Sequence, residues 1–221
     1  MINENSYRDI CSYCKDHNVT LVAVSKTKPV SDIQQLYGMG QRVFGENKVQ
    51  EILEKCGQLP DDIEWHLIGH LQTNKVKQIL PYVGLIHSVD SLHLMQEIEQ
   101  QAQKQQKKIQ VLLQLKIAEE DTKYGLDENE LTEILKKVAN DNYGHIEVRG
   151  LMGMASFTES ETQVRAEFSA LKQKFDEIKK QGLVNLGRFD ILSMGMSGDF
   201  QIAIEEGSNM IRVGSLIFGE R

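Results

Sequence analysis

The sequence has few cysteines, prolines and aromatic residues. Its 221 residues include three cysteines and three prolines, and aromatic residues make up 6% of the chain. An odd number of cysteines without a secretion signal argues against a disulfide framework. Cys11 and Cys14 have the spacing of redox or zinc sites, but no second pair exists. We therefore interpret them as small apolar residues of an N-terminal helix and predict no metal site.

Long apolar runs and an excess of positive charge are also missing. No run reaches the roughly 18 apolar residues of a membrane-spanning helix, and no signal peptide is evident, which predicts a soluble, cytoplasmic protein with no membrane contact. Twenty-five basic and 32 acidic residues give a net charge of −7. Such a surface repels polyanions, so we expect no nucleic-acid partner, although backbone amides can still hold one small phosphate.

Short β-rich segments alternate with helical patterns along the chain. We predict strands over residues 21–25, 42–45, 64–69, 85–89, 109–117, 147–152, 190–193 and 210–214. We predict helices over residues 31–37, 48–56, 73–80, 92–106, 128–139, 161–181 and 198–205. This alternation implies parallel strands joined by right-handed crossovers.

Eight such units predict an α/β fold of the (β/α)8 TIM barrel type, forming one domain over residues 1–221 with an extra N-terminal helix over residues 7–17. A doubly wound open sheet is the alternative. No Gly-x-Gly-x-x-Gly motif follows the first strand, which weakens a dinucleotide-binding interpretation.

Lys26 stands at the end of the first predicted strand. The apolar run over residues 21–24 precedes it, and Pro29 prevents the strand from continuing. A lysine at such a strand end is partly removed from water, which favours a neutral amine able to form a Schiff base with an aldehyde. The alternative from this segment alone is an ordinary solvated lysine in a loop.

The last two strands end in small residues. Strand seven leads into Ser197 and Gly198, and strand eight ends at Gly214 and Ser215. Phosphate often binds after strands seven and eight of such barrels, where small residues allow backbone amides to approach it. These two segments together predict a phosphate site.

The third strand carries His66 and, four residues later, His70. The two straddle a strand end and a loop, so we favour His66 as a polar group within the barrel mouth over a metal ligand. Asn47 follows the second strand, where its amide can both donate and accept hydrogen bonds.

Taken together, these segments resemble a known family. The matching segments are residues 23–29, 44–47, 65–75, 150–152, 192–197 and 212–219, in that order. They are similar to the pyridoxal phosphate homeostasis proteins, which are single-domain relatives of the alanine racemase barrel. The resemblance covers nearly the whole chain, and its most specific part is the stretch from Trp65 to Lys75.

The resemblance implies a fold-type III site for pyridoxal 5′-phosphate, with Lys26 forming the Schiff base. It implies phosphate contacts from Ser197, Gly214 and Ser215, and places Arg212 against the pyridine nitrogen. The remaining residues that it implies around the cofactor are Asn47, His66 and Met152.

The function implied is that of a non-catalytic carrier, a pyridoxal phosphate-binding protein acting in vitamin B6 homeostasis. Arginine keeps its proton, so Arg212 leaves the ring nitrogen unprotonated and the cofactor a poor electron sink. Racemisation also needs a second base, and this chain ends six residues after Ser215, so we expect no second domain to supply one.

Several questions stay open at this point. Tyr124 lies in a loop near Asp121, Thr122 and Lys123, and nothing in the sequence places it opposite Lys26. The alternative functions are an amino-acid racemase or another pyridoxal phosphate enzyme, and a sugar-phosphate enzyme on the same barrel. We expect a monomer, with apo forms of pyridoxal phosphate-dependent enzymes as recipients of the cofactor.

Overall fold

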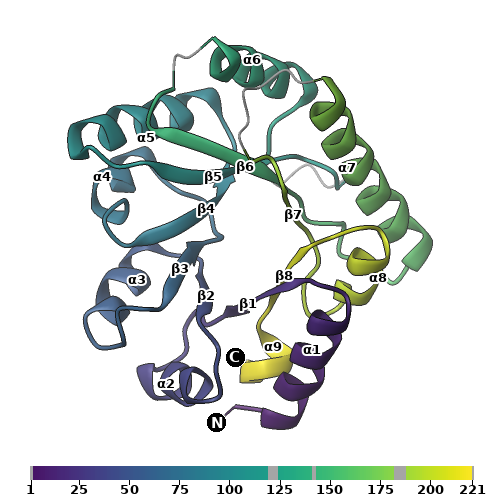
Figure 1. The fold of residues 1–221 in the computed structure, drawn as a ribbon. Coiled ribbons are helices and arrows are strands. Elements are labelled where there is room, and N and C mark those ends of the chain that lie inside the picture. The colour runs from purple at the N-terminus through teal and green to yellow at the C-terminus, as the bar shows by residue number, and fades with distance from the viewer. Residues whose placement is uncertain (1, 119–123, 141–142, 182–187, 221) are drawn as a thin grey trace.

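The computed structural model describes residues 2–118, 124–140, 143–181 and 188–220 as a ring of strands surrounded by helices (Figure 1). The strands are β1 (Thr20–Val24), β2 (Val43–Glu46), β3 (Glu64–Leu67), β4 (Val83–Val89), β5 (Ile109–Gln114), β6 (Ile146–Met152), β7 (Ile191–Ser193) and β8 (Met210–Val213). Each strand pairs in parallel with the next, and β8 pairs with β1 to close the barrel. The predicted TIM barrel is confirmed, and the open sheet is excluded.

The helices form the outer layer. They are α1 (Glu4–Asp16), α2 (Val30–Gly38), α3 (Val49–Cys56), α4 (Val76–Ile79), α5 (Leu92–Gln105), α6 (Glu128–Ala139), α7 (Glu161–Gln181), α8 (Phe200–Glu205) and α9 (Ser215–Phe218). The predicted helix over residues 73–80 begins as a 3-10 turn, η1 (Thr73–Lys75), before α4. None of the helices in the described part of the chain combines the length and the apolar composition of a membrane-spanning segment.

Capping residues fix several helix starts. The Asn3 side chain accepts a hydrogen bond from the Ser6 amide at the start of α1. Asp127 and Glu130 form a reciprocal capping box at the start of α6. These bonds satisfy backbone N–H groups that have no acceptor within the helix. The predicted N-terminal helix is thereby confirmed, but it starts three residues earlier than expected, at Glu4.

Apolar side chains occupy both faces of the strands. One large cluster fills the layer between the barrel and the helices. A smaller cluster lies inside the barrel and consists of Val22, Leu85, Leu112, Met152 and Met210. Because neighbouring residues of a strand face opposite sides, a parallel barrel buries both sets, which explains the nearly continuous apolar runs in the sequence.

Gly150 lies at an irregular point in the pairing of β5 with β6, where the register shifts between Val111 and Leu112. Its φ is +155°, and a Cβ there would lie 1.7 Å from the carbonyl oxygen of Ile191. Strands β6 and β7 therefore approach each other too closely at Gly150 for any side chain to fit there.

We expect Gly150→Ala to lower the free energy of unfolding by about 3 kcal/mol, because backbone must move to admit the methyl group. Urea unfolding followed by circular dichroism measures the change. Gly57→Ala is the matched control, since a Cβ there meets nothing within 4 Å. Similar unfolding midpoints for the two variants would contradict the close approach of β6 and β7.

Candidate functional site

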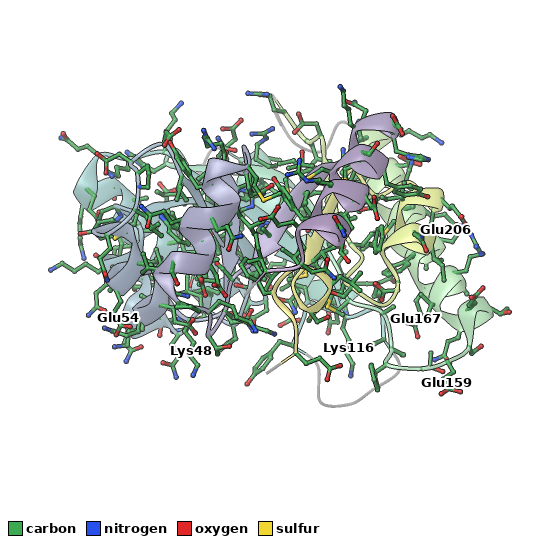
Figure 2. All side chains as sticks on the ribbon, turned by 90° about the horizontal axis from the view of Figure 1, so that it is seen from below. Lys48, Glu54, Lys116, Glu159, Glu167 and Glu206 are labelled. Atoms are coloured by element: carbon green, nitrogen blue, oxygen red, sulfur yellow. The ribbon has the colours of Figure 1, made fainter. Side chains whose placement is uncertain are left out.

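Several of the predicted site residues lie just beyond the ends of strands. Lys26 and Asn47 follow β1 and β2, and Ser197 and Gly214 follow β7 and β8. Figure 2 shows Lys48, Lys116 and Glu159, which follow β2, β5 and β6, toward the same lower edge of the molecule. Barrel closure thus brings side chains that are distant in the sequence to one end of the fold, as parallel barrels require.

Lys26 is half-buried and lines a cavity of about 280 Å³ at this end of the barrel. Gly214 and Ser215 line the same cavity. In the part of the chain that the structure describes, the Lys26 amine makes no hydrogen bond or ion pair. It is therefore available to an electrophile that enters the cavity.

Lys28, two residues later, is engaged instead. Its Nζ donates to the carbonyl oxygens of Phe218, Gly219 and Glu220 at 3.0, 3.1 and 3.2 Å. Three acceptors use the full donor capacity of an ammonium group. Both lysines line the cavity, but among the described residues Lys28 has three acceptors, whereas the Lys26 amine has none.

The loops after β7 and β8 are joined by a hydrogen bond. The Gly214 amide donates to the Ser197 hydroxyl at 3.2 Å. A Cβ at Gly214 would lie 3.1 Å from the Val24 carbonyl oxygen, so this loop also packs tightly against the end of β1. Ser215 is exposed and begins α9. Two hydroxyl groups and the amides of a first helical turn therefore lie together, a donor set suited to phosphate.

Arg212 is buried on β8. Its Nη1 donates to Ser193 Oγ at 2.6 Å, and its Nη2 donates to the Gly153 carbonyl oxygen at 3.0 Å. Burial lowers the pKa of Arg212 to about 10, against a smaller opposing effect of Asp199, and the group stays protonated near neutral pH. Among the described residues, no carboxylate lies within ion-pair distance of this guanidinium.

A chain of polar side chains crosses the barrel interior to Arg212. His87 Nδ1 lies 3.1 Å from Ser193 Oγ, and its Nε2 lies 2.9 Å from His66 Nδ1. His66 Nε2 in turn lies 3.0 Å from Glu64 Oε1. Burial, followed by repulsion from His66 and Arg212, lowers the pKa of His87, so its ring is neutral.

Both ring nitrogens of His66 are therefore used by protein groups, and this residue supports the interior network. His70 bonds Asp90 at 2.8 Å instead, so the two histidines of the motif belong to different environments. Our sequence reasoning missed His87 and Ser193. The available signal was a polar residue inside an apolar strand, which needs a buried partner.

Asn47 and Met152 occupy different levels of the barrel. Asn47 is half-buried beyond β2, and its backbone oxygen would lie 2.4 Å from a Cβ at Gly69, so the ends of β2 and β3 pack closely. Met152 is 1% exposed and belongs to the interior apolar cluster. Asn47 thus lies at the barrel mouth, whereas Met152 lies in its packed interior.

Tyr124 is 60% exposed. Its ring stacks on His70 with the centroids 4.3 Å apart. The neighbouring Asp121, Thr122 and Lys123 lie outside the described residues. Tyr124 is thereby held against the His70 ring in this structure.

Two of the three cysteines lie on the N-terminal helix and not at the strand ends. Cys11 and Cys14 lie on α1, and burial raises the pKa of the Cys14 thiol to about 12. Among the described residues, no three His, Cys, Asp or Glu side chains are grouped to bind a metal.

A buried acidic side chain that the sequence analysis did not identify is bonded to Ser25, the residue before Lys26. Glu46, at the end of β2, is fully buried, and its Oε1 accepts hydrogen bonds from Ser25 Oγ at 2.6 Å and Lys55 Nζ at 2.8 Å. Its Oε2 has no hydrogen-bond partner among the described residues. Burial raises the pKa of Glu46 to about 7, because removal from water outweighs the opposing effect of the two hydrogen bonds.

We expect Glu46 to make stability depend on pH. Between its ordinary pKa of 4.5 and its folded pKa of about 7, the folded state holds a proton that the unfolded state releases. Its contribution to stability therefore decreases as pH rises through this window, by at most about 3 kcal/mol. Urea unfolding of wild type and Glu46→Gln at pH 5 and pH 8 measures it. A stability difference between the two proteins that does not change with pH would refute the raised pKa.

Comparisons with known proteins identify the relatives of this chain. The family model for the alanine racemase N-terminal domain matches residues 3–221. The pyridoxal phosphate homeostasis protein of Aquifex aeolicus (strain VF5) is 42% identical over 202 residues, covering 91% of this chain and 86% of the relative. The protein of the same name from Pasteurella multocida (strain Pm70) is 39% identical over 206 residues, covering 92% and 87%.

A solved structure of a protein with bound pyridoxal phosphate is also similar to this chain. PipY of Synechococcus elongatus PCC7942, with pyridoxal phosphate bound, superimposes with a TM-score of 0.83 at 34% identity, covering 91% of this chain and 93% of that one. The chain described here therefore belongs to the alanine racemase N-terminal domain family and, within it, to the pyridoxal phosphate homeostasis proteins.

Proposed function

We propose that this protein binds pyridoxal 5′-phosphate at Lys26 and takes part in pyridoxal phosphate homeostasis as a carrier, without substantial catalysis. The observation that carries the proposal is the Lys26 amine, which has no partner among the described residues and shares a cavity with Gly214 and Ser215. The names of the relatives and the cofactor in the PipY structure support the same conclusion.

The donor set of the site fits this cofactor. When bound, pyridoxal phosphate supplies an aldehyde that forms a reversible Schiff base with a lysine amine. Ser197, Gly214 and Ser215 would hold the phosphate through hydroxyl and amide donors. The remaining proposed contacts are Arg212 at the ring nitrogen, Asn47 beside the ring, and His66 and Met152 from the barrel interior.

Arg212 sets the chemistry that this site allows. Its guanidinium donates hydrogen bonds and, with a pKa of about 10, keeps its proton near neutral pH. Ser193 and the neutral His87 ring fix its position without adding a carboxylate. A ring nitrogen beside it therefore stays unprotonated, which disfavours carbanion chemistry and favours holding and release.

The described acid–base groups favour the same function. Racemisation requires a second proton carrier within hydrogen-bond reach of the opposite face of the substrate. The Tyr124 ring is stacked on His70, and His66 and His87 are bonded to each other inside the barrel.

We propose that the protein is a monomer and that apo forms of pyridoxal phosphate-dependent enzymes receive the cofactor.

We expect borohydride to fix the mass of the reduced cofactor on Lys26 of the wild-type protein. Lys26→Ala is expected to lose this capture and the associated visible absorbance while keeping its fold, since the amine makes no contact that the fold needs. Peptide mass mapping measures the outcome, with Lys48→Ala, an exposed lysine at the same end of the barrel, as the control. Capture at Lys28 or Lys116 in the wild-type protein would refute the assignment.

The second test separates a carrier from a racemase. In deuterium oxide, we expect the loaded protein to exchange the α-proton of amino acids no faster than free pyridoxal phosphate does, because none of the described residues is positioned as a second base. When mixed with an apo-enzyme, the loaded protein is expected to restore that enzyme's activity. Rapid α-deuterium incorporation measured by NMR would favour an amino-acid racemase or another pyridoxal phosphate enzyme instead.

A further inference from the structure

Lys55 is a buried cation on the inner face of α3. Its side chain is 9% exposed. Its Nζ donates to the Ser25 carbonyl oxygen at 3.0 Å, to Glu46 Oε1 at 2.8 Å and to Glu51 Oε2 at 3.0 Å. All three donors of the ammonium are thus used, and every acceptor lies on or next to the loop that carries Lys26.

The two carboxylates continue these contacts to both neighbours of Lys26. Ser25 Oγ donates to Glu46 Oε1 at 2.6 Å. The Thr27 amide donates to Glu51 Oε2 at 2.6 Å. Lys55 therefore connects, directly or through one carboxylate, to the residue before Lys26 and to the residue after it.

Thr27 shows that this loop is held in a conformation it would not adopt alone. Its φ is +64°, in the left-handed region that β-branched residues rarely occupy. Such a conformation persists only where the surroundings enforce it. The Glu51 carboxylate supplies that constraint through the Thr27 amide.

Fold stability alone does not explain these buried charges. Taking the Lys55 ammonium and the Glu46 side chain almost fully, and the Glu51 side chain partly, out of water costs free energy that their attraction repays only in part, and apolar replacements are often as stable. Glu46 Oε2 is even left without a partner among the described residues. The gain lies in the defined geometry of the loop.

We propose that Lys55 is a positioning residue: with Glu46 and Glu51, it fixes the loop from Ser25 to Thr27 so that the Lys26 amine is presented to its cavity. This inference rests on the proposed function, because its consequence is measured as uptake of pyridoxal phosphate. It adds three residues outside the cavity to those that determine cofactor binding.

Lys55→Met tests the proposal with two readouts. In protein without added cofactor, we expect hydrogen exchange of the Thr27 amide to accelerate about tenfold or more, because its acceptor is no longer fixed. We expect the affinity for pyridoxal phosphate, from an absorbance titration, to fall about tenfold, because pre-organisation of the amine is lost. The double variant Glu46→Gln, Lys55→Met removes the stranded carboxylate and is expected to show the same two effects.

Arg149→Met is the matched control. It breaks another ion pair made by a buried cation, between Arg149 Nη2 and Asp190 Oδ1 at 2.7 Å, with the arginine side chain 8% and the aspartate side chain 49% exposed. This variant is expected to unfold more easily but to keep both readouts within about twofold of wild type. Glu51→Gln retains an oxygen for the Thr27 amide and is expected to bind the cofactor more tightly than Glu51→Ala.

The outcomes separate the two claims. Wild-type protein that binds the cofactor, together with a Lys55→Met variant that binds it equally tightly, would overturn the positioning role alone. An equal loss of affinity in Arg149→Met would also overturn it, because a general loss of stability would then be the cause. Wild-type protein that takes up no cofactor would overturn the proposed function and the positioning role with it.

Discussion

The pairing of the first strand with the last is the constraint on which the site depends. Val22 pairs with Arg212, and Ala23 pairs with Val213. This register sets Lys26, at one end of the chain, beside Gly214 and Ser215 at the other. A one-residue slip would turn each strand's side chains to the opposite face and move Arg212 out of the barrel interior. Closure of the ring therefore builds the site as well as the fold.

Polar groups inside the barrel are acceptable only because each is partnered. Arg212, Ser193 and His87 lie where most barrels place branched apolar residues, and hydrogen bonds link them in sequence. The chain continues through His66 to Glu64, whose side chain is 55% exposed at the start of β3. Among the described residues, a charged guanidinium is thereby held in a buried place by hydrogen bonds and not by a carboxylate, and we propose that this limits the chemistry of the site.

The fold could be predicted from the sequence because strand and helix patterns are local. Much of the site could not be predicted in this way. Lys26 could be proposed because Pro29 and the apolar run mark a strand end and because the family resemblance gives this position the Schiff base. His87 was hidden in an apolar strand, and α9 has one turn, too short for helical periodicity. Lys55 falls three residues after Ile52 on the buried face of α3, but only tertiary structure shows which acceptors it meets.

Lys26 and Lys28 show why composition does not assign function. The two side chains have the same chemistry and stand two residues apart, yet their partners differ. Lys28 is bound by the carbonyl oxygens that end α9, the helix whose first residue is Ser215. The loop that bears the Lys26 amine is thus bound to the helix whose first residue, Ser215, we propose as a phosphate donor. The aldehyde and phosphate ends of a cofactor would therefore meet groups held at a constant separation. Lys26 differs from Lys28 because, among the described residues, its amine makes no hydrogen bond or ion pair.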